Sequence, residues 1–206
     1  MMKHTPLTIC LAALLTVSGY TQAADEKDKD ADAPVKEVKT VEVELKGGLK
    51  LNVPENWKQS EPSSRLRLAQ FAIPAAKDDS EEGELAIFNF GAGGGAKANI
   101  DRWIGQFQSD EREVTVKEGA IEAGRYFFVE IAGTYNKPVG PPIAQQTKAT
   151  PDSRMLGVIL GVEDKGIYFL KMTGPDKTIA AQAAALRRSF AADAKKEKEV
   201  NLDELR

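Results

Sequence analysis

Several stretches of the sequence are apolar at nearly every position, and they constrain the fold more than any other feature. They read ELAIFNF, RYFFVEIAGTY, RMLGVILGV and GIYFLKMTG. A strand with one face in water alternates apolar and polar residues, whereas a continuous apolar run indicates a strand that is buried on both faces. The sequence therefore predicts a sheet that is covered on both sides, most simply by helices.

Shorter strands are indicated before these runs. VEVEL and LKLNV alternate apolar and polar residues on either side of Gly47 and Gly48, which is typical of a hairpin. RLRLAQFAI alternates through Leu66 and Leu68 and then changes phase at Phe71, which indicates a β-bulge.

Two helices are available to cover the sheet. The first has Asn99 as its expected N-cap. Its apolar face contains Ile100, Trp103, Ile104 and Phe107. The second follows TGPD, and we expect Arg187 and Arg188 to point away from the core. Its apolar stripe contains Ile179, Ala183, Leu186 and Phe190. Because strands and helices come in groups and do not strictly alternate, we expect an α+β fold: an α/β/α sandwich with a mostly antiparallel central sheet and two main helices.

Two loops stand out between these elements. The segment 136–153 is rich in proline, and we expect an exposed loop whose length makes it either functional or disordered. The segment 91–96, GAGGGA, fits the dinucleotide-binding pattern between a strand and a helix. However, three strand segments precede it, and no acidic residue ends a second strand about 20 residues on. We interpret it as a turn that needs positive φ, while binding of another anion at the helix start stays open.

The N-terminus predicts export. Residues 1–23 combine Lys3, an apolar stretch over 7–17 and the small-x-small run Thr21-Gln22-Ala23, which is the layout of a secretory signal peptide. An uncleaved anchor is the alternative. We expect a periplasmic or extracellular protein without a membrane span after cleavage, because the apolar stretch is short.

The remainder divides into three parts by composition. Residues 24–40 read as a charged linker, 41–191 as a single domain, and 192–206 as a charged extension that frays from the last helix. The linker begins like a calcium loop, but its sixth position is Ala33 and its twelfth is Lys39, so the calcium interpretation fails.

Composition excludes several kinds of chemistry. Signal removal would remove the only histidine, His4, and the only cysteine, Cys10. Without them no Ser-His-Asp or Cys-His nucleophile can be assembled, and zinc, copper, haem and iron–sulfur sites lose their usual ligands. Carboxylate, lysine, tyrosine and hydroxyl chemistry remains, with oxygen-ligated Ca²⁺ or Mg²⁺ at most. We assign no cofactor, no metal site and no catalytic residue. The net charge of −3 gives no electrostatic signature for nucleic acid.

Three segments resemble known sequences. GLKLNVPENW, FNFGAGGGAKANIDRWIGQF and YFLKMTGPDKTIAAQAAALRRSF resemble PsbP-like domains and uncharacterised secreted bacterial proteins of that fold group. The resemblance covers about 47–191. It implies an α/β/α sandwich. It does not imply catalysis, because better-known members of the fold group act as accessory binding proteins. The matched residues look mainly structural, so no functional residue is transferred.

Six residues are candidates for contact with a ligand or partner. They are Gly93, Gly94, Gly95, Arg102, Tyr135 and Lys171. Arg102 opposes the dipole near a helix start, with a structural ion pair as the alternative. Tyr135 is placed to line a cleft beside the long loop. Lys171 alternates with Phe169 on a buried face, so it either reaches to the edge or is functional.

These observations lead to three functional hypotheses. The first is an exported, non-catalytic binding or accessory protein of the bacterial envelope, with an envelope protein as partner. The second is a carboxylate- or lysine-dependent enzyme such as a hydrolase; it requires a concave pocket with at least two acids, or a lysine with a lowered pKa. Glu81, Glu82 and Glu84 would supply acids, although they also read as a charged turn. The third is a structural envelope protein without a small ligand.

Overall fold

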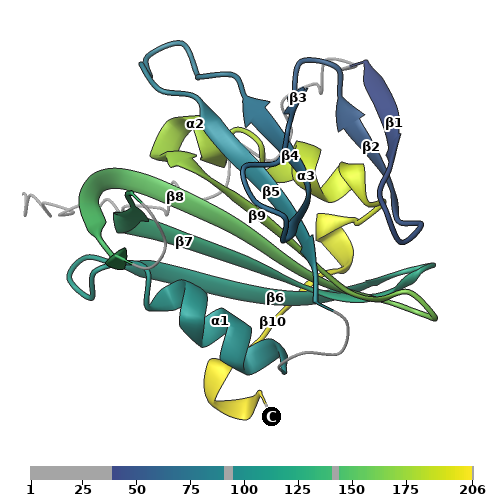
Figure 1. The fold of residues 1–206 in the computed structure, drawn as a ribbon. Helices are drawn as coiled ribbons and strands as arrows, with labels where there is room; N and C mark the ends of the chain where they lie inside the picture. Colours follow the sequence, from purple (N-terminus) through teal and green to yellow (C-terminus); the bar gives the residue numbers. More distant parts are fainter. Residues whose placement is uncertain (1–38, 91–94, 141–143, 206) are drawn as a thin grey trace, which may run out of the picture. The chain divides into compact units, whose positions relative to one another are not determined.

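The long apolar stretches form one antiparallel sheet, which confirms the expected architecture (Figure 1). The structure is a computed structural model that describes residues 39–90, 95–140 and 144–205, all within one compact unit. The order of the sheet is β10-β6-β7-β8-β9-β5-β4-β3, and each pair of neighbours is antiparallel. The expected signal peptide and most of the expected linker lie outside the described residues.

The elements have the following bounds. The strands of this sheet are β3 (Lys58–Ser60), β4 (Arg67–Ile73), β5 (Gly83–Asn89), β6 (Glu113–Ile121), β7 (Gly124–Pro138), β8 (Thr147–Val162), β9 (Gly166–Pro175) and β10 (Lys198–Glu199). A separate hairpin consists of β1 (Thr40–Glu44) and β2 (Lys50–Pro54). The α-helices are α1 (Ala96–Ile104), α2 (Asp176–Ala180) and α3 (Ala183–Ser189).

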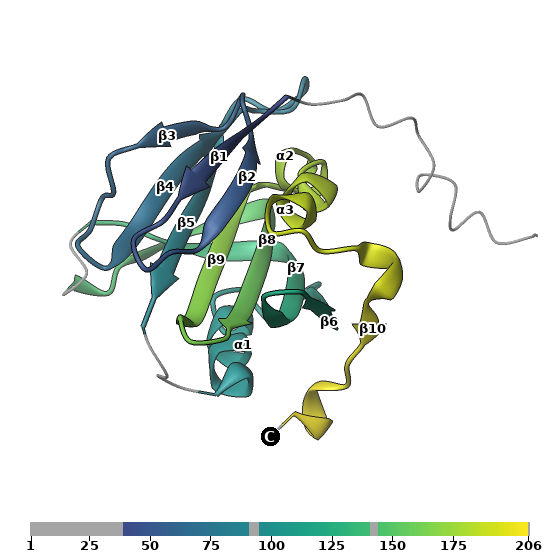
Figure 2. The same ribbon diagram turned by 90° about the vertical axis from the view of Figure 1, so that its right-hand side faces the viewer.

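Both faces of the sheet are covered. Along β7, Phe128 belongs to the core shared with α2, α3 and the β1–β2 hairpin, whereas the next residue, Val129, belongs to the core shared with α1. Val158 and Ile159 divide in the same way on β8. Figure 2 shows α1 on one side of the strands and α2 with α3 on the other. Burial on both faces explains why these strands lack polar alternation.

The N-terminal hairpin and the bulge follow the sequence prediction. Val41 pairs with Val53 across the hairpin, and Gly47 and Gly48 occupy its turn with φ of 101° and 82°. A Cβ on Gly47 would lie 2.7 Å from the hydroxyl of Tyr168, so close packing adds to the need for glycine. The register of β4 against β5 shifts between Arg67 and Ala69, which confirms the bulge.

The start of the first helix differs from the expectation. Gly95 is the N-cap, so Asn99 lies inside α1. The Asn99 amide instead donates to the carbonyl oxygen of Gly95 at 3.2 Å, a bond to residue i−4 that competes with capping. Ile100 and Trp103 are buried, as predicted. Phe107 is also buried, but it lies beyond the end of α1.

The second expected helix is divided into α2 and α3. Of the two arginines expected to point away from the core, Arg188 is exposed as predicted and Arg187 is not. Ile179, Leu186 and Phe190 are buried as predicted. Arg187, however, does not point away: its side chain is 10% exposed and its guanidinium lies 3.5 Å from the centroid of the Phe128 ring. Arginine can occupy this place because its planar group stacks on an aromatic face and a carboxylate neutralises it.

That carboxylate comes from the charged C-terminal extension, which is not a frayed helix. The side chain of Glu197 is fully buried and accepts two 2.8 Å bonds from Arg187, and the hydroxyl of Tyr126 donates to it at 3.1 Å. The next two residues form β10 on the edge of β6. The extension therefore contributes a strand and a buried ion pair to the fold.

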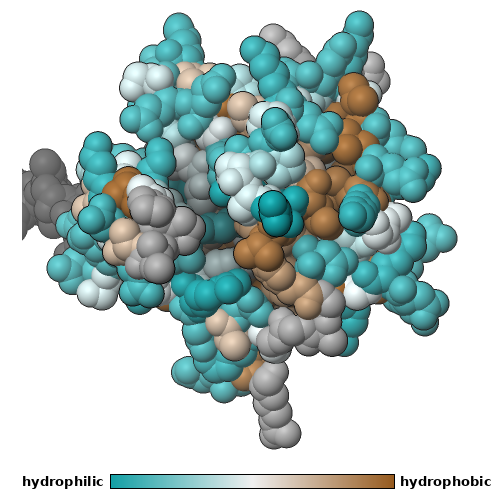
Figure 3. Space-filling view, in the orientation of Figure 1, coloured by the Kyte–Doolittle hydropathy of each residue, from teal (hydrophilic) through white to brown (hydrophobic). Residues whose placement is uncertain are grey.

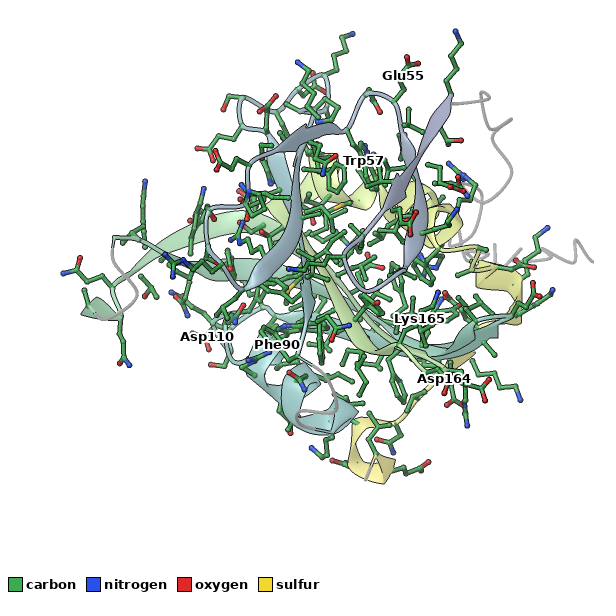
Figure 4. All side chains as sticks on the ribbon, turned by 45° about the vertical axis from the view of Figure 1, so that its right-hand side comes forward. Glu55, Trp57, Phe90, Asp110, Asp164 and Lys165 are labelled. Atoms are coloured by element: carbon green, nitrogen blue, oxygen red, sulfur yellow. The ribbon has the colours of Figure 1, made fainter. Side chains whose placement is uncertain are left out.

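Both tryptophans are buried and structural. Trp57 is 3% exposed, and its indole nitrogen donates to the side chain of Gln182 at 3.1 Å. In Figure 4 its ring points from the segment after β2 toward the interior. Trp103 packs over Gly157, where a Cβ would lie 2.4 Å from its ring. Glycine on β8 thus sets how closely α1 approaches the sheet.

Candidate functional site

A cleft of about 720 Å³ opens on the α1 face of the sheet, beyond the end of that helix. Its floor is formed by β5 and β9, one wall by the 78–82 loop, and the other wall by the distal ends of β7 and β8. In Figure 3 the surface is hollowed beside the tip of the β7–β8 hairpin. The volume lies within the range of about 300–1,000 Å³ that is usual for small-molecule sites.

Strand register determines which side chains form the floor. Ala86 of β5 is paired with Lys171 of β9, and Glu84 with Thr173. Directly paired residues of an antiparallel ladder point to the same face, so these four side chains share the floor. Phe88, two residues beyond Ala86, extends the floor toward α1.

The wall from β7 and β8 corrects the expectation of a long loop. The two strands remain paired as far as Pro138 with Thr147, so most of 136–153 is an extended hairpin. The register shifts between Gly133 and Tyr135, and such a bulge bends the strands. The residues 141–143 at its tip lie outside the described residues. Proline is tolerated here because Pro138 belongs to the last pair of the ladder and Pro151 lies at the register shift, where it has no partner on β7.

Lys171 lies at the end of the cleft nearest α1. Its ammonium donates to the side-chain oxygen of Gln106 at 2.6 Å and to the hydroxyl of Tyr135 at 3.1 Å. Within the described residues it forms no ion pair. Burial, helped by the positive charges of Arg102 and Arg67, lowers the pKa of Lys171 to about 8.

The segment after α1 brings the partners of Lys171 together. The backbone nitrogen of Asn136 donates to the carbonyl oxygen of Gln106 at 2.8 Å, so the chain after α1 runs beside β7. Phe107 bridges to Tyr135, and their ring centroids are 5.1 Å apart. Tyr135 is 7% exposed, and burial followed by the charge of Glu84 raises its pKa to about 12. Its hydroxyl therefore stays protonated across the physiological range.

A second cation reaches the floor from β4. The Nη1 atom of Arg67 donates to the side-chain oxygen of Gln70 at 2.7 Å and forms an ion pair with Glu84 at 2.8 Å. The Nε and Nη2 donors of the guanidinium have no acceptor among the described residues. The guanidinium also lies 5.9 Å from the centroid of the Phe88 ring.

The 78–82 loop makes the opposite wall acidic. Asp79 has a structural role, since it accepts bonds from the backbone and hydroxyl of Thr178 and so caps α2. Glu81 lies 3.8 Å from Lys137 of β7, across the opening. Asp78 and Glu82 line the cleft without an ion-pair partner in the part of the chain that the structure describes. The wall therefore carries more carboxylates than are neutralised by cations of the described residues.

The structure brings only part of the candidate set together. Tyr135 and Lys171 are in direct contact at the cleft. Arg102 does not line the cleft; it is exposed on α1 and donates to Asn99 at 2.8 Å. Gly95 precedes α1 with nothing within 4 Å of a Cβ placed on it, so it shows no close approach. Gly93 and Gly94 lie outside the described residues.

Sequence reasoning did not identify Arg67 or Gln106 as part of this site. Arg67 sits at a bulge, where alternation no longer tells which face a side chain occupies. Gln106 follows the end of a helix and contacts a lysine 65 residues away. One sequence signal for Arg67 was available: its strand comes just before ELAIFNF, whose Glu84 offers an opposite charge, and the structure pairs these two strands.

Two further observations concern metals and membranes. Within 39–90, 95–140 and 144–205, no group of three or more histidine, cysteine, aspartate or glutamate residues is arranged to hold a metal ion. In the same residues, no helix has the length and apolarity needed to cross a bilayer.

No known protein family matches the chain, and no curated protein matches it either. Solved structures of similar fold include the cyanobacterial PsbP of Synechocystis, with 10% identity and a TM-score of 0.44, covering 82% of this chain and 98% of that one. They also include the Ran-binding protein Mog1p of Saccharomyces cerevisiae, with 12% identity and a TM-score of 0.44, covering 82% of this chain and 100% of that one. The likeness is one of fold group alone, and it says nothing about function.

Proposed function

We propose that this protein is an exported binding or accessory protein of the bacterial envelope and that the cleft holds its ligand or a segment of its partner. The observation that carries the proposal is Lys171, a half-buried cation in a cleft of about 720 Å³ with no carboxylate partner in the described residues. A buried charge is costly unless it is paired. A ligand group would supply the missing partner.

Export is supported by the sequence. Lys3, the apolar stretch 7–17 and the run before Ala24 have the layout of a cleavable signal, and the resemblance to secreted PsbP-like proteins points the same way. The test is the intact mass of the protein isolated from the envelope of its own cells. A chain that begins at Ala24 supports export with cleavage, whereas a full-length chain in the soluble cell fraction contradicts it.

Binding is tested by isolation of the protein from its own envelope under mild cross-linking, followed by native mass spectrometry. The wild type, Lys171→Met and Lys58→Met are compared, because Lys58 is an exposed lysine on β3 that serves as a matched control. We expect a co-purifying molecule or protein that is retained by the wild type and by Lys58→Met and lost from Lys171→Met. Equal recovery from all three, or nothing bound to any, contradicts the proposal.

A lysine-dependent enzyme remains the second candidate, and a specific observation favours it. A pKa of about 8 leaves a fraction of Lys171 as the neutral amine at pH 7, beside carboxylates in a concave site. Its lone pair would attack a carbonyl carbon to form an imine, with loss of water. Reduction with cyanoborohydride in the presence of a small aldehyde, followed by peptide mass mapping, would locate the modification at Lys171. Labelling no faster than at Lys58 counts against this candidate.

A further inference from the structure

The cleft has two ends of opposite electrostatic character. We call Lys171, Tyr135 and Arg67 the donor end, and Asp78, Glu82 and Asp152 the acidic end; all six line the cleft. The other charged lining residues already have partners: Glu84 pairs with Arg67, Glu81 pairs with Lys137, and Asp79 accepts hydrogen bonds from Thr178. Each set comes from more than one element, so the difference belongs to the folded cleft and not to one charged run of the sequence. The distribution constrains the chemistry of a ligand.

The donor end offers hydrogen bonds that the described residues do not use. An ammonium can donate three hydrogen bonds, and Lys171 donates two, to Gln106 and to Tyr135. The Tyr135 hydroxyl accepts from Lys171, and its own hydrogen has no recorded acceptor among the described residues. Arg67 retains its Nε and Nη2 donors. A carboxylate is the complementary group, since it accepts several charge-assisted hydrogen bonds at once.

At the acidic end, carboxylates lack positively charged partners. Asp78, Glu82 and Asp152 have no ion pair within the described residues. Asp152 adopts a φ of 48° on β8, and Ser153 beside it is paired with Pro175 of β9. An ammonium or guanidinium group is what would neutralise such a wall.

The strands give the spacing between the two ends. Along β9, Thr173 lies two residues and Pro175 four residues beyond Lys171, or about 7 and 13 Å at roughly 3.3 Å per residue. The ammonium and carboxylate of glycine are attached to a single carbon and cannot span that distance. A carboxylate at the donor end therefore needs its cation on a long side chain or at the far end of a short peptide.

We propose that the cleft binds a zwitterion: a basic amino acid, or a short peptide with a free C-terminus and a cation at its other end. Its carboxylate contacts the donor end, Lys171, Tyr135 and Arg67. Its distant amine or guanidinium faces the acidic end, Asp78, Glu82 and Asp152. This inference rests on the proposed binding function and specifies the ligand of that same cleft. The two sources share one chemistry, and the test separates them.

Calorimetric titration with four probes tests the inference. L-Arginine carries both groups, agmatine lacks the carboxylate, L-citrulline has a neutral side chain, and Lys-Gly-Gly has a free C-terminus with an N-terminal and a side-chain amine. We expect arginine or Lys-Gly-Gly to bind, and agmatine and citrulline to bind about ten- to a hundredfold more weakly, because each lacks one charge-assisted contact. Preference between arginine and the tripeptide identifies the source.

Variants locate the two contacts. Lys171→Met should remove the preference for arginine over agmatine, Glu82→Gln should reduce the preference for arginine over citrulline, and Lys58→Met should change neither. A carboxylate beside Lys171 also raises its pKa from about 8, so binding at pH 8 takes up a proton that calorimetry in two buffers detects. If Lys171 had only a structural role, ligand binding would not be accompanied by proton uptake at this amine.

Three outcomes overturn the inference. They are equal binding of agmatine, equal binding of citrulline, and no binding of any probe. If no probe binds while a native ligand is still lost from Lys171→Met, the ligand class is wrong and the proposed function stands. If the native ligand is also absent, both are wrong.

Discussion

Lys171 shows how much a single residue contributes to the character of this cleft. Alternation with Phe169 placed it on a buried face, and the structure shows that this is the α1 face and adds its contacts with Gln106 and Tyr135. Those contacts come from segments far apart in the sequence, so no local pattern could predict them. Alternation could predict that Lys171 lies on a buried face of the sheet. Its hydrogen-bond partners and its lowered pKa depend on the tertiary structure.

The lowered pKa of Lys171 predicts a pH dependence of stability. Its pKa is about 8 in the folded protein and 10.5 as the ordinary value, so between these values the unfolded chain binds more protons and stability rises with pH. Relative to Lys171→Met, the wild type should gain roughly 2 kcal/mol in free energy of unfolding between pH 7 and 10, at about 1.4 kcal/mol per pKa unit. The charges that face this amine belong to Arg67, Arg102 and Glu84.

Urea unfolding of both proteins at each pH unit measures this difference. Lys58→Met is the control, since its lysine is exposed, and its difference from the wild type should stay flat. Above pH 10 the raised pKa values of Tyr126 and Tyr135, each about 12, lower the stability of every variant, because these tyrosines ionise first in the unfolded chain. Parallel curves for wild type and Lys171→Met would refute the prediction.

Glu197 carries a second prediction at this scale. Glu197→Gln leaves the guanidinium of Arg187 buried without its counter-charge, and breaking a buried pair in this way costs about 3–5 kcal/mol. The exposed Glu199 on β10 provides the control, and Glu199→Gln should change the free energy of unfolding by less than about 0.5 kcal/mol. Denaturant midpoints decide between the two; similar small losses in both variants would contradict the role of the pair.

At the scale of elements, the sequence predicted identities better than boundaries. The N-terminal hairpin, the bulge and the long strands were found because apolar periodicity is a local property. The break between α2 and α3 and the start of α1 at Ala96 were missed. The segment 136–153 was read as a loop from its prolines, yet pairing with β7 stabilises most of it as strand. Tertiary pairing overrode local propensity there.

Docking of α1 on the sheet depends on Gly157. Gly157→Ala places a Cβ 2.4 Å from the ring of Trp103, so α1 must shift, and overpacking of this kind costs about 1–3 kcal/mol. Gly161→Ala on the same strand is the control, because the nearest atom to its Cβ is 3.7 Å away. Urea unfolding measures both, and hydrogen exchange in α1 should rise in the first variant alone. Equal stabilities would show that α1 adapts without strain.

At the scale of the whole molecule, the sequence predicted the layers but not the order of the strands. Periodicity shows that a strand is buried on both faces without showing which strand lies beside it. The neighbours β5 and β9 form the floor of the cleft, and the 78–82 loop faces the β7–β8 hairpin only because of that order. The cleft could therefore not be predicted from the sequence, although five of its lining residues were named: Tyr135, Lys171, Glu81, Glu82 and Glu84.

The C-terminal segment protects one edge of the sheet. Deletion of 194–206 removes β10 and Glu197, which exposes the edge of β6 and leaves Arg187 unpaired. We expect a lower thermal midpoint and a larger share of dimers or aggregates by light scattering, because unpaired edges invite strand pairing between molecules. A chain that ends at Val200 keeps both features and loses only the packing of Leu202 and Leu205 against the core on the α1 side, so it should lose less thermal stability and should not aggregate. Identical behaviour of the two truncations would contradict this role.

The same strand order has a consequence for the way the chain folds. From β6 to β9, each strand pairs with the next one along the chain, so these contacts close short loops. The pairing of β5 with β9 instead joins Glu84 to Thr173, across α1 and three intervening strands. Its entropic cost of closure is higher, since that cost grows with the length of the loop. The floor of the cleft is formed by this pair of strands. A ligand of the cleft therefore binds only those molecules in which β5 and β9 have already paired, and its binding measures that step of folding.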